Sequence, residues 1–89
     1  MSTRSELIRA SLERELQPLQ IDVEDESHRH AGHEGARDGR GHFRVRIVAA
    51  AFAGVPLLKR HQRVYAALGE LMRTDIHALA IDARAPDEA

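Results

Sequence analysis

The sequence predicts a small α+β domain in which three short strands are covered on one face by two or more helices. Two observations predict this class. Apolar residues recur at helical spacing in two stretches of the chain, and they alternate with polar residues in three others. The length of 89 residues leaves room for one domain, so residues 1–89 are expected to form a single unit.

The first helix is expected over about residues 4–16. Thr3 and Glu6 have the spacing of a capping box, in which a hydroxyl and a carboxylate satisfy the free N–H groups at a helix start. The apolar positions that follow recur every four residues, at Ile8, Leu12 and Leu16. Pro18 cannot continue a helix, so the element ends before it.

Three segments alternate in hydropathy and are expected as strands, over residues 19–24, 43–48 and 78–83. In the second strand Arg44 and Arg46 are expected to point to one face. Between the second and third strands, apolar residues follow helical spacing up to about Arg73, and periodicity leaves open whether this is one helix or two. The element order from these patterns is α-β-β-α-β.

Two segments are expected outside regular structure. Residues 26–41 are rich in histidine and glycine and nearly free of apolar side chains, so they predict a flexible polar loop. Loops of this length tend to be functional or disordered. The tail, residues 84–89, is expected to be turn or disorder.

The chain contains no cysteine but six histidines. It therefore has no disulfide, thiol nucleophile or thiolate ligand, and any metal must bind imidazole or carboxylate. Four of the histidines fall within fifteen residues: His28, His30, His33 and His42. Their spacing can bring two rings onto a zinc or nickel ion, with a solvated polar loop as the alternative, and the strand next to His42 could aim its ring.

Composition excludes other classes. The longest apolar runs are far shorter than the roughly 18 residues of a membrane helix. The N-terminal residues lack the apolar core of a secretory signal, so a cytoplasmic location is expected. With no cysteine and no converging acidic residues, the chain is not expected to be an enzyme.

A basic cluster on the second helical stretch is the candidate nucleic-acid contact. It comprises Lys59, Arg60 and Arg63, and the two arginines are three apart and share a helix face. Against this, the net charge is −1, whereas a DNA-binding domain is usually basic. A solvated helix face is the alternative. His61 lies on the apolar stripe and is expected to be packed.

Several short motifs, in order and at matching spacing, make nearly the whole chain resemble the BolA family. They are Asp25-Glu26-Ser27, His30, Phe43, Phe52-Ala53-Gly54, Arg60-His61-Gln62-Arg63-Val64-Tyr65, Ile76-His77-Ala78-Leu79 and Pro86. The resemblance implies an α-β-β-α-α-β arrangement related to the type II KH fold, with a C-terminal helical turn. The chain lacks the tryptophan that the family typically places after this proline.

The resemblance implies an adaptor in iron-sulfur cluster trafficking and iron regulation. Such a protein pairs with a monothiol glutaredoxin and its glutathione and shares a bridging 2Fe-2S cluster, which the chain alone would not hold stably. The ligands implied are His30 and His77, with His33 and His42 in reserve. The chain alone is expected to be a monomer or a weak homodimer. The alternative that the family implies is a DNA-binding transcriptional regulator of morphology and stress response.

Overall fold

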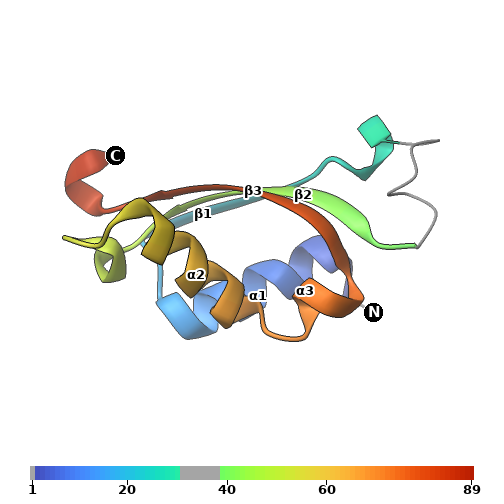
Figure 1. Ribbon diagram of the computed structural model, residues 1–89, viewed down its shortest axis with the longest axis horizontal. Helices are drawn as coiled ribbons and strands as arrows, with labels where there is room; N and C mark the ends of the chain where they lie inside the picture. The colour runs from blue at the N-terminus through green and yellow to red at the C-terminus, as the bar shows by residue number, and fades with distance from the viewer. Residues whose placement is uncertain (1, 31–38) are drawn as a thin grey trace.

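The sheet in the computed structural model has the strand order β1-β2-β3, and helices lie against one of its faces (Figure 1). The structure describes residues 2–30 and 39–89. Strand β1 (Gln20–Asp25) pairs antiparallel with β2 (Gly41–Val48), which pairs parallel with β3 (Ile76–Arg84). The predicted α+β class with one covered face is therefore confirmed.

Helices α1 (Arg4–Leu16), α2 (Leu57–Leu68) and α3 (Leu71–Thr74) cover that face. α1 has the predicted bounds because its capping box forms. The Thr3 hydroxyl accepts from the Glu6 N–H at 3.2 Å, and the Glu6 carboxylate accepts from the Thr3 N–H at 3.0 Å. The helical stretch that periodicity left open is divided into α2 and α3, as the resemblance implied. No helix in the described residues has the length and apolar character needed to cross a membrane.

The core lies between the sheet and the helices. Alternate residues of β2 point toward the helices and are almost fully buried, because side chains alternate between the faces of a strand. The largest fully buried side chains come from every layer: Ile8, Leu12, Phe43, Val45, Ile47, Phe52, Val64 and Ile76. Burial of one such side chain stabilises the fold by roughly 1.5–3 kcal/mol.

The irregular segments contain more structure than the sequence predicted. The first residues of the predicted loop form a single 3-10 turn, η1 (Ser27–His30), and residues 31–38 lie outside the described part of the chain. A second 3-10 turn, η3 (Ala50–Phe52), follows β2. The tail forms a third, η4 (Pro86–Glu88), which is the C-terminal turn that the resemblance implied.

Candidate functional site

Two of the predicted ligands come together where β2 and β3 begin. The ring centroids of His42 and His77 lie 5.2 Å apart, with 47° between the ring planes. The two strands are parallel, so both begin at the same end of the sheet. His77 is exposed and His42 is half-buried. This end of the sheet therefore presents the exposed His77 ring to a partner, with the His42 ring beside it and its Nε2 atom buried.

An irregularity in strand pairing accounts for the position of His77. Gly41 pairs with Ile76, whereas the next residue of β2, His42, pairs with Ala78. His77 is thus an extra residue on β3, and both His77 and Ala78 are exposed. A bulge of this kind redirects side chains, and such bulges are frequent beside functional sites. The sequence predicted that β3 begins at residue 78 and so placed His77 before the strand.

The Asp25-Glu26-Ser27 motif holds the backbone of His42. The Ser27 N–H donates to Asp25 Oδ1 at 2.9 Å, which closes the turn that these residues predict. The Ser27 hydroxyl accepts from the His42 N–H at 3.1 Å, and the Glu26 N–H donates to the His42 carbonyl at 2.8 Å. The motif therefore fixes the point from which the His42 ring projects.

Arg40 contacts His77 and was not singled out from the sequence. Its Nη2 lies 3.3 Å from His77 Nδ1, and its Nη1 donates to the Arg73 carbonyl at 3.5 Å. A guanidinium can only donate, so Nδ1 is the acceptor in this contact. Arg40 lies in the predicted loop with no helical or strand pattern around it, which is why sequence reasoning missed it.

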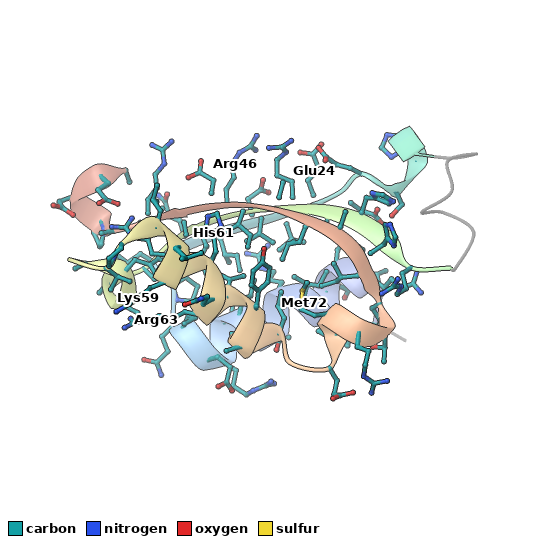
Figure 2. All side chains as sticks on the ribbon, in the orientation of Figure 1. Glu24, Arg46, Lys59, His61, Arg63 and Met72 are labelled. Carbon is teal, nitrogen blue, oxygen red and sulfur yellow. The ribbon has the colours of Figure 1, made fainter. Side chains whose placement is uncertain are left out.

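The remaining histidines are distributed differently. The backbone of His30 lies in η1, while its side chain and the whole of His33 fall outside the described residues. His28 is exposed in the same turn, and His61 is half-buried on α2 (Figure 2). Within residues 2–30 and 39–89, no group of three His, Cys, Asp or Glu side chains could hold a metal ion together.

The exposed face of the sheet carries Arg44 and Arg46, as predicted, but both are paired with carboxylates. Arg44 Nε lies 3.2 Å from Glu26 Oε2, and Arg46 Nη1 lies 3.5 Å from Asp22 Oδ2. Figure 2 shows Arg46 and Glu24 on the side of the sheet away from the helices. The positive charge of β2 is therefore offset by acidic residues beside it.

Arg60 lies on α2, as predicted, but its side chain is buried. It is 6% exposed, and its guanidinium donates to both carboxylate oxygens of Glu88 at 2.5 and 2.8 Å. It also donates to the carbonyls of Val55 at 2.6 Å and Ala83 at 3.1 Å. Arg60 is therefore not accessible beside Arg63 for the predicted phosphate contact, because the C-terminal turn covers it.

Lys59 and Arg63, the other predicted nucleic-acid contacts, are exposed. Arg63 Nη1 donates to the Ala51 carbonyl at 2.7 Å. Figure 2 shows both side chains on the part of α2 that faces away from the sheet. The predicted cluster is thus reduced to two accessible cations.

Glu88 attaches the C-terminal turn to the rest of the fold. Its Oε1 also accepts from the Ala85 N–H at 2.8 Å. The hydrogen bond from Arg60, followed by that from Ala85, lowers the pKa of the Glu88 carboxyl to about 2, and the same pairing raises the pKa of Arg60. The Arg60–Glu88 ion pair therefore attaches η4 to the fold. The chain lacks the tryptophan expected after Pro86 from the sequence resemblance.

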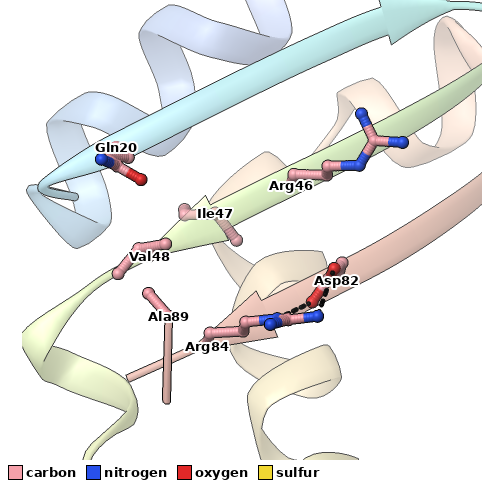
Figure 3. A pocket seen from close by; sticks show the side chains of 7 residues that line it. All are labelled: Gln20, Arg46, Ile47, Val48, Asp82, Arg84 and Ala89. Atoms are coloured by element: carbon pink, nitrogen blue, oxygen red, sulfur yellow. Dashed lines mark hydrogen bonds and ion pairs between the residues drawn. The ribbon is translucent and has the colours of Figure 1, made fainter. Parts of the chain in front are cut away.

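A shallow cavity of about 350 Å³ lies beside this turn on the exposed face of the sheet (Figure 3). Its lining comprises Gln20, Arg46, Ile47, Val48, Asp82, Arg84 and Ala89. Arg84 Nε donates to Asp82 Oδ1 at 2.9 Å, and Arg46 pairs with Asp22. Both arginines of the cavity thus have carboxylate partners, so the two histidines at the opposite end of β2 and β3 are the stronger candidate site.

Comparisons with known proteins agree with this fold. Residues 12–88 match the family model described as BolA-like protein. SufE-like protein 1 of Arabidopsis thaliana is 43% identical over 93 residues, which cover 99% of this chain and 25% of that protein. Protein BOLA1, chloroplastic, of the same plant is 40% identical over 92 residues, which cover 100% of this chain and 58% of that protein. The chain thus spans about a quarter of the first relative and somewhat less than two thirds of the second.

A bacterial relative and a solved structure complete the comparison. The protein named DNA-binding transcriptional regulator BolA, from Haemophilus influenzae, is 36% identical over 83 residues, which cover 93% of this chain and 78% of that protein. The structure of the BolA domain of SufE1 from Arabidopsis thaliana has a TM-score of 0.86 and 42% identity, and the match covers 100% of this chain and 99% of that chain. The chain belongs to the BolA family.

Proposed function

We propose that this chain is a non-enzymatic adaptor in iron-sulfur trafficking and iron regulation that binds a monothiol glutaredoxin and shares a bridging 2Fe-2S cluster with it. His77 is one ligand. The other is a histidine from the loop before β2, His30 or His33, or His42 at the start of β2. The observation that carries the proposal is the pair of neighbouring rings, His42 and exposed His77, at one end of the sheet.

The separation of the ring centres is compatible with a shared metal ion. Imidazole replaces two thiolates on one iron of Rieske-type clusters. For a metal–nitrogen distance of about 2.1 Å and tetrahedral angles, the centres of two bound imidazoles lie about 5 Å apart. The centroids of His42 and His77 are 5.2 Å apart. His42 is therefore favoured as the second ligand, and His30 and His33 are the alternatives from the loop.

The partner follows from the missing thiolates. The sequence contains no cysteine, so a cluster that it shares must take its thiolates from elsewhere. A monothiol glutaredoxin supplies one from its own cysteine and one from glutathione. We place this complex in the cytoplasm, with the chain alone a monomer or a weak homodimer.

Anaerobic cluster reconstitution with a monothiol glutaredoxin tests the proposal. Visible absorption and circular dichroism would be recorded for the wild type and for His77→Ala, His42→Ala and His30→Ala. We expect His77→Ala to abolish the spectrum of the mixed cluster, and the other two variants to identify the second ligand. His61→Gln, which removes an imidazole from α2, is the matched control. Unchanged spectra in His77→Ala would contradict the assignment.

A second candidate function is DNA binding in transcriptional regulation of morphology and stress response. Two observations favour it: the name of the Haemophilus influenzae relative and the exposed cations Lys59 and Arg63 on α2. Arg60 is left out of this proposal because its guanidinium is buried against Glu88. A DNA contact through α2 would therefore use a smaller basic surface than the sequence suggested.

Salt dependence tests this second candidate. Each phosphate contact contributes a slope of about −0.9 to the plot of log affinity against log salt concentration. We expect the double substitution Lys59→Ala, Arg63→Ala to make this slope less steep by about 1.8, which corresponds to two lost phosphate contacts. Arg9→Ala on α1 is the control for the loss of one exposed cation. A slope that the double substitution leaves unchanged would remove α2 from the interface.

A further inference from the structure

The contact between Arg40 and His77 determines which atoms of the His77 ring can bind a metal. Arg40 Nη2 lies 3.3 Å from His77 Nδ1. Arginine remains protonated and has no acceptor, so the lone pair of Nδ1 faces the guanidinium. A neutral imidazole whose Nδ1 accepts carries its proton on Nε2. In this arrangement, neither ring nitrogen presents a lone pair that a metal can take while Arg40 stays in place. Moving the proton to Nδ1 would free Nε2 but would set two N–H donors against each other, so that route also breaks the Arg40 contact.

Arg40 is held in this position by a backbone hydrogen bond of the next residue and by a second contact of its guanidinium. The N–H of the next residue, Gly41, donates to the Asp75 carbonyl at 2.9 Å. The other terminal nitrogen of Arg40, Nη1, donates to the Arg73 carbonyl at 3.5 Å. The guanidinium thus lies between the end of α3 and the His77 ring. Its positive charge also disfavours a bare metal cation at that ring.

We propose that Arg40 restrains metal binding at His77 by occupying Nδ1, so that ligation requires the guanidinium to leave. This inference rests on the proposed role of His77 as a ligand. Arg40 is a positioning residue in this scheme, because it acts through the His77 ring and has no contact with the metal. It sets how readily the free chain takes up a metal.

A metal titration of the full chain without any partner tests the proposal. Zn²⁺ affinity would be measured by competition with a chromophoric chelator for the wild type, Arg40→Met, His77→Ala and the double variant. Loss of one exposed hydrogen bond corresponds to about two- to tenfold in affinity, so Arg40→Met should bind Zn²⁺ tighter by about that factor. The gain should be absent in the His77→Ala background, as a double-mutant cycle requires.

Two further measurements distinguish the Arg40–His77 contact from a general effect of positive charge on Zn²⁺ affinity. Arg9→Met removes an exposed arginine from α1 and should leave the affinity unchanged. In long-range ¹H–¹⁵N spectra of the free chain, Arg40→Met should move the His77 Nδ1 shift toward that of a ring nitrogen without a donor. No movement of this shift would overturn the contact itself.

Two outcomes of the titration would overturn the role assigned to Arg40. One is an Arg40→Met affinity equal to that of the wild type. The other is an equal gain in the His77→Ala background, because charge removal would then act without His77. Neither outcome bears on cluster reconstitution with glutaredoxin, where loss of the spectrum in His77→Ala remains the test of the proposed function.

Discussion

Ring and guanidinium nitrogens lie at the two ends of the β2–β3 pair in opposite environments. Where the strands begin, His42 and His77 lie side by side and His77 is exposed. Where they finish, Arg60 is buried and its guanidinium is matched by the Glu88 carboxylate and two carbonyls. The comparison teaches that residue type does not identify a site, because hydrogen-bonding groups that are satisfied internally are not available to a partner.

The physical reason lies in the cost of burying charge. A buried guanidinium is tolerated only when it is paired and hydrogen-bonded, and Arg60 meets that condition with acceptors from three separate segments. The imidazoles at the other end are held by the backbone around them: the Asp25-Glu26-Ser27 motif anchors His42, and a bulge turns His77. One end is therefore structural, whereas the other exposes the His77 ring to solvent.

The largest effect is expected at the open end, from Gly41→Ala. A Cβ at this position would lie 2.6 Å from a Phe43 ring carbon and 2.7 Å from the Ser27 hydroxyl. The Phe43 ring is buried and cannot move freely, so the free energy of unfolding should fall by about 1–3 kcal/mol. Denaturant unfolding measures this. An unchanged midpoint and slope would show that the Phe43 ring and the Ser27 hydroxyl accommodate a Cβ at this position.

The closed end should respond next, to Glu88→Ala. This substitution leaves Arg60 without its carboxylate partner, so we expect Tm to fall by several degrees in thermal unfolding. Asp87→Ala, in the same turn, is the matched control and should leave Tm unchanged. Equal effects of the two substitutions would mean that the turn contributes through its general charge and not through the Arg60–Glu88 pair.

The stabilisation from Glu88 should also depend on pH, and this part of the effect is expected to be smaller. The pKa of Glu88 is lowered from 4.5 to about 2 in the folded chain. The stabilisation from its carboxylate is therefore present above about pH 4.5 and is lost as the pH falls toward 2. The difference in Tm between the wild type and Glu88→Gln should shrink across this window. A difference that stays constant down to pH 2 would contradict the ion pair.

The smallest effect is expected from the pair of Arg46 and Asp22 on the exposed face. Their side chains are 57% and 66% exposed, and their charged atoms lie 3.5 Å apart. Solvent screens such pairs, so a double-mutant cycle with Arg46→Ala and Asp22→Ala should give a coupling below about 1 kcal/mol. The coupling should decrease in high salt. A larger, salt-independent value would show that exposure does not distinguish this pair from the one at the closed end.

Local signals in the sequence predicted much of the fold. The bounds of α1 follow from a capping box and an apolar stripe, both of which act within a few residues. The strands were found by alternation, to within one or two residues at most of their ends. For the site, the sequence resemblance implied His77 as a ligand. The sequence indicated His42 as an alternative ligand because a strand follows it.

What the sequence by itself determined is the α+β class, the order of α1 and the three strands, and the absence of thiolate ligands, because these depend on local periodicity and on which residue types are present. Only the tertiary structure decided that Arg60 is buried against Glu88, that a bulge turns His77 toward His42, and that Arg40 contacts His77. Each of these joins residues far apart in the chain. Burial and hydrogen-bond partners across such separations depend on how the elements pack, and no local pattern encodes them.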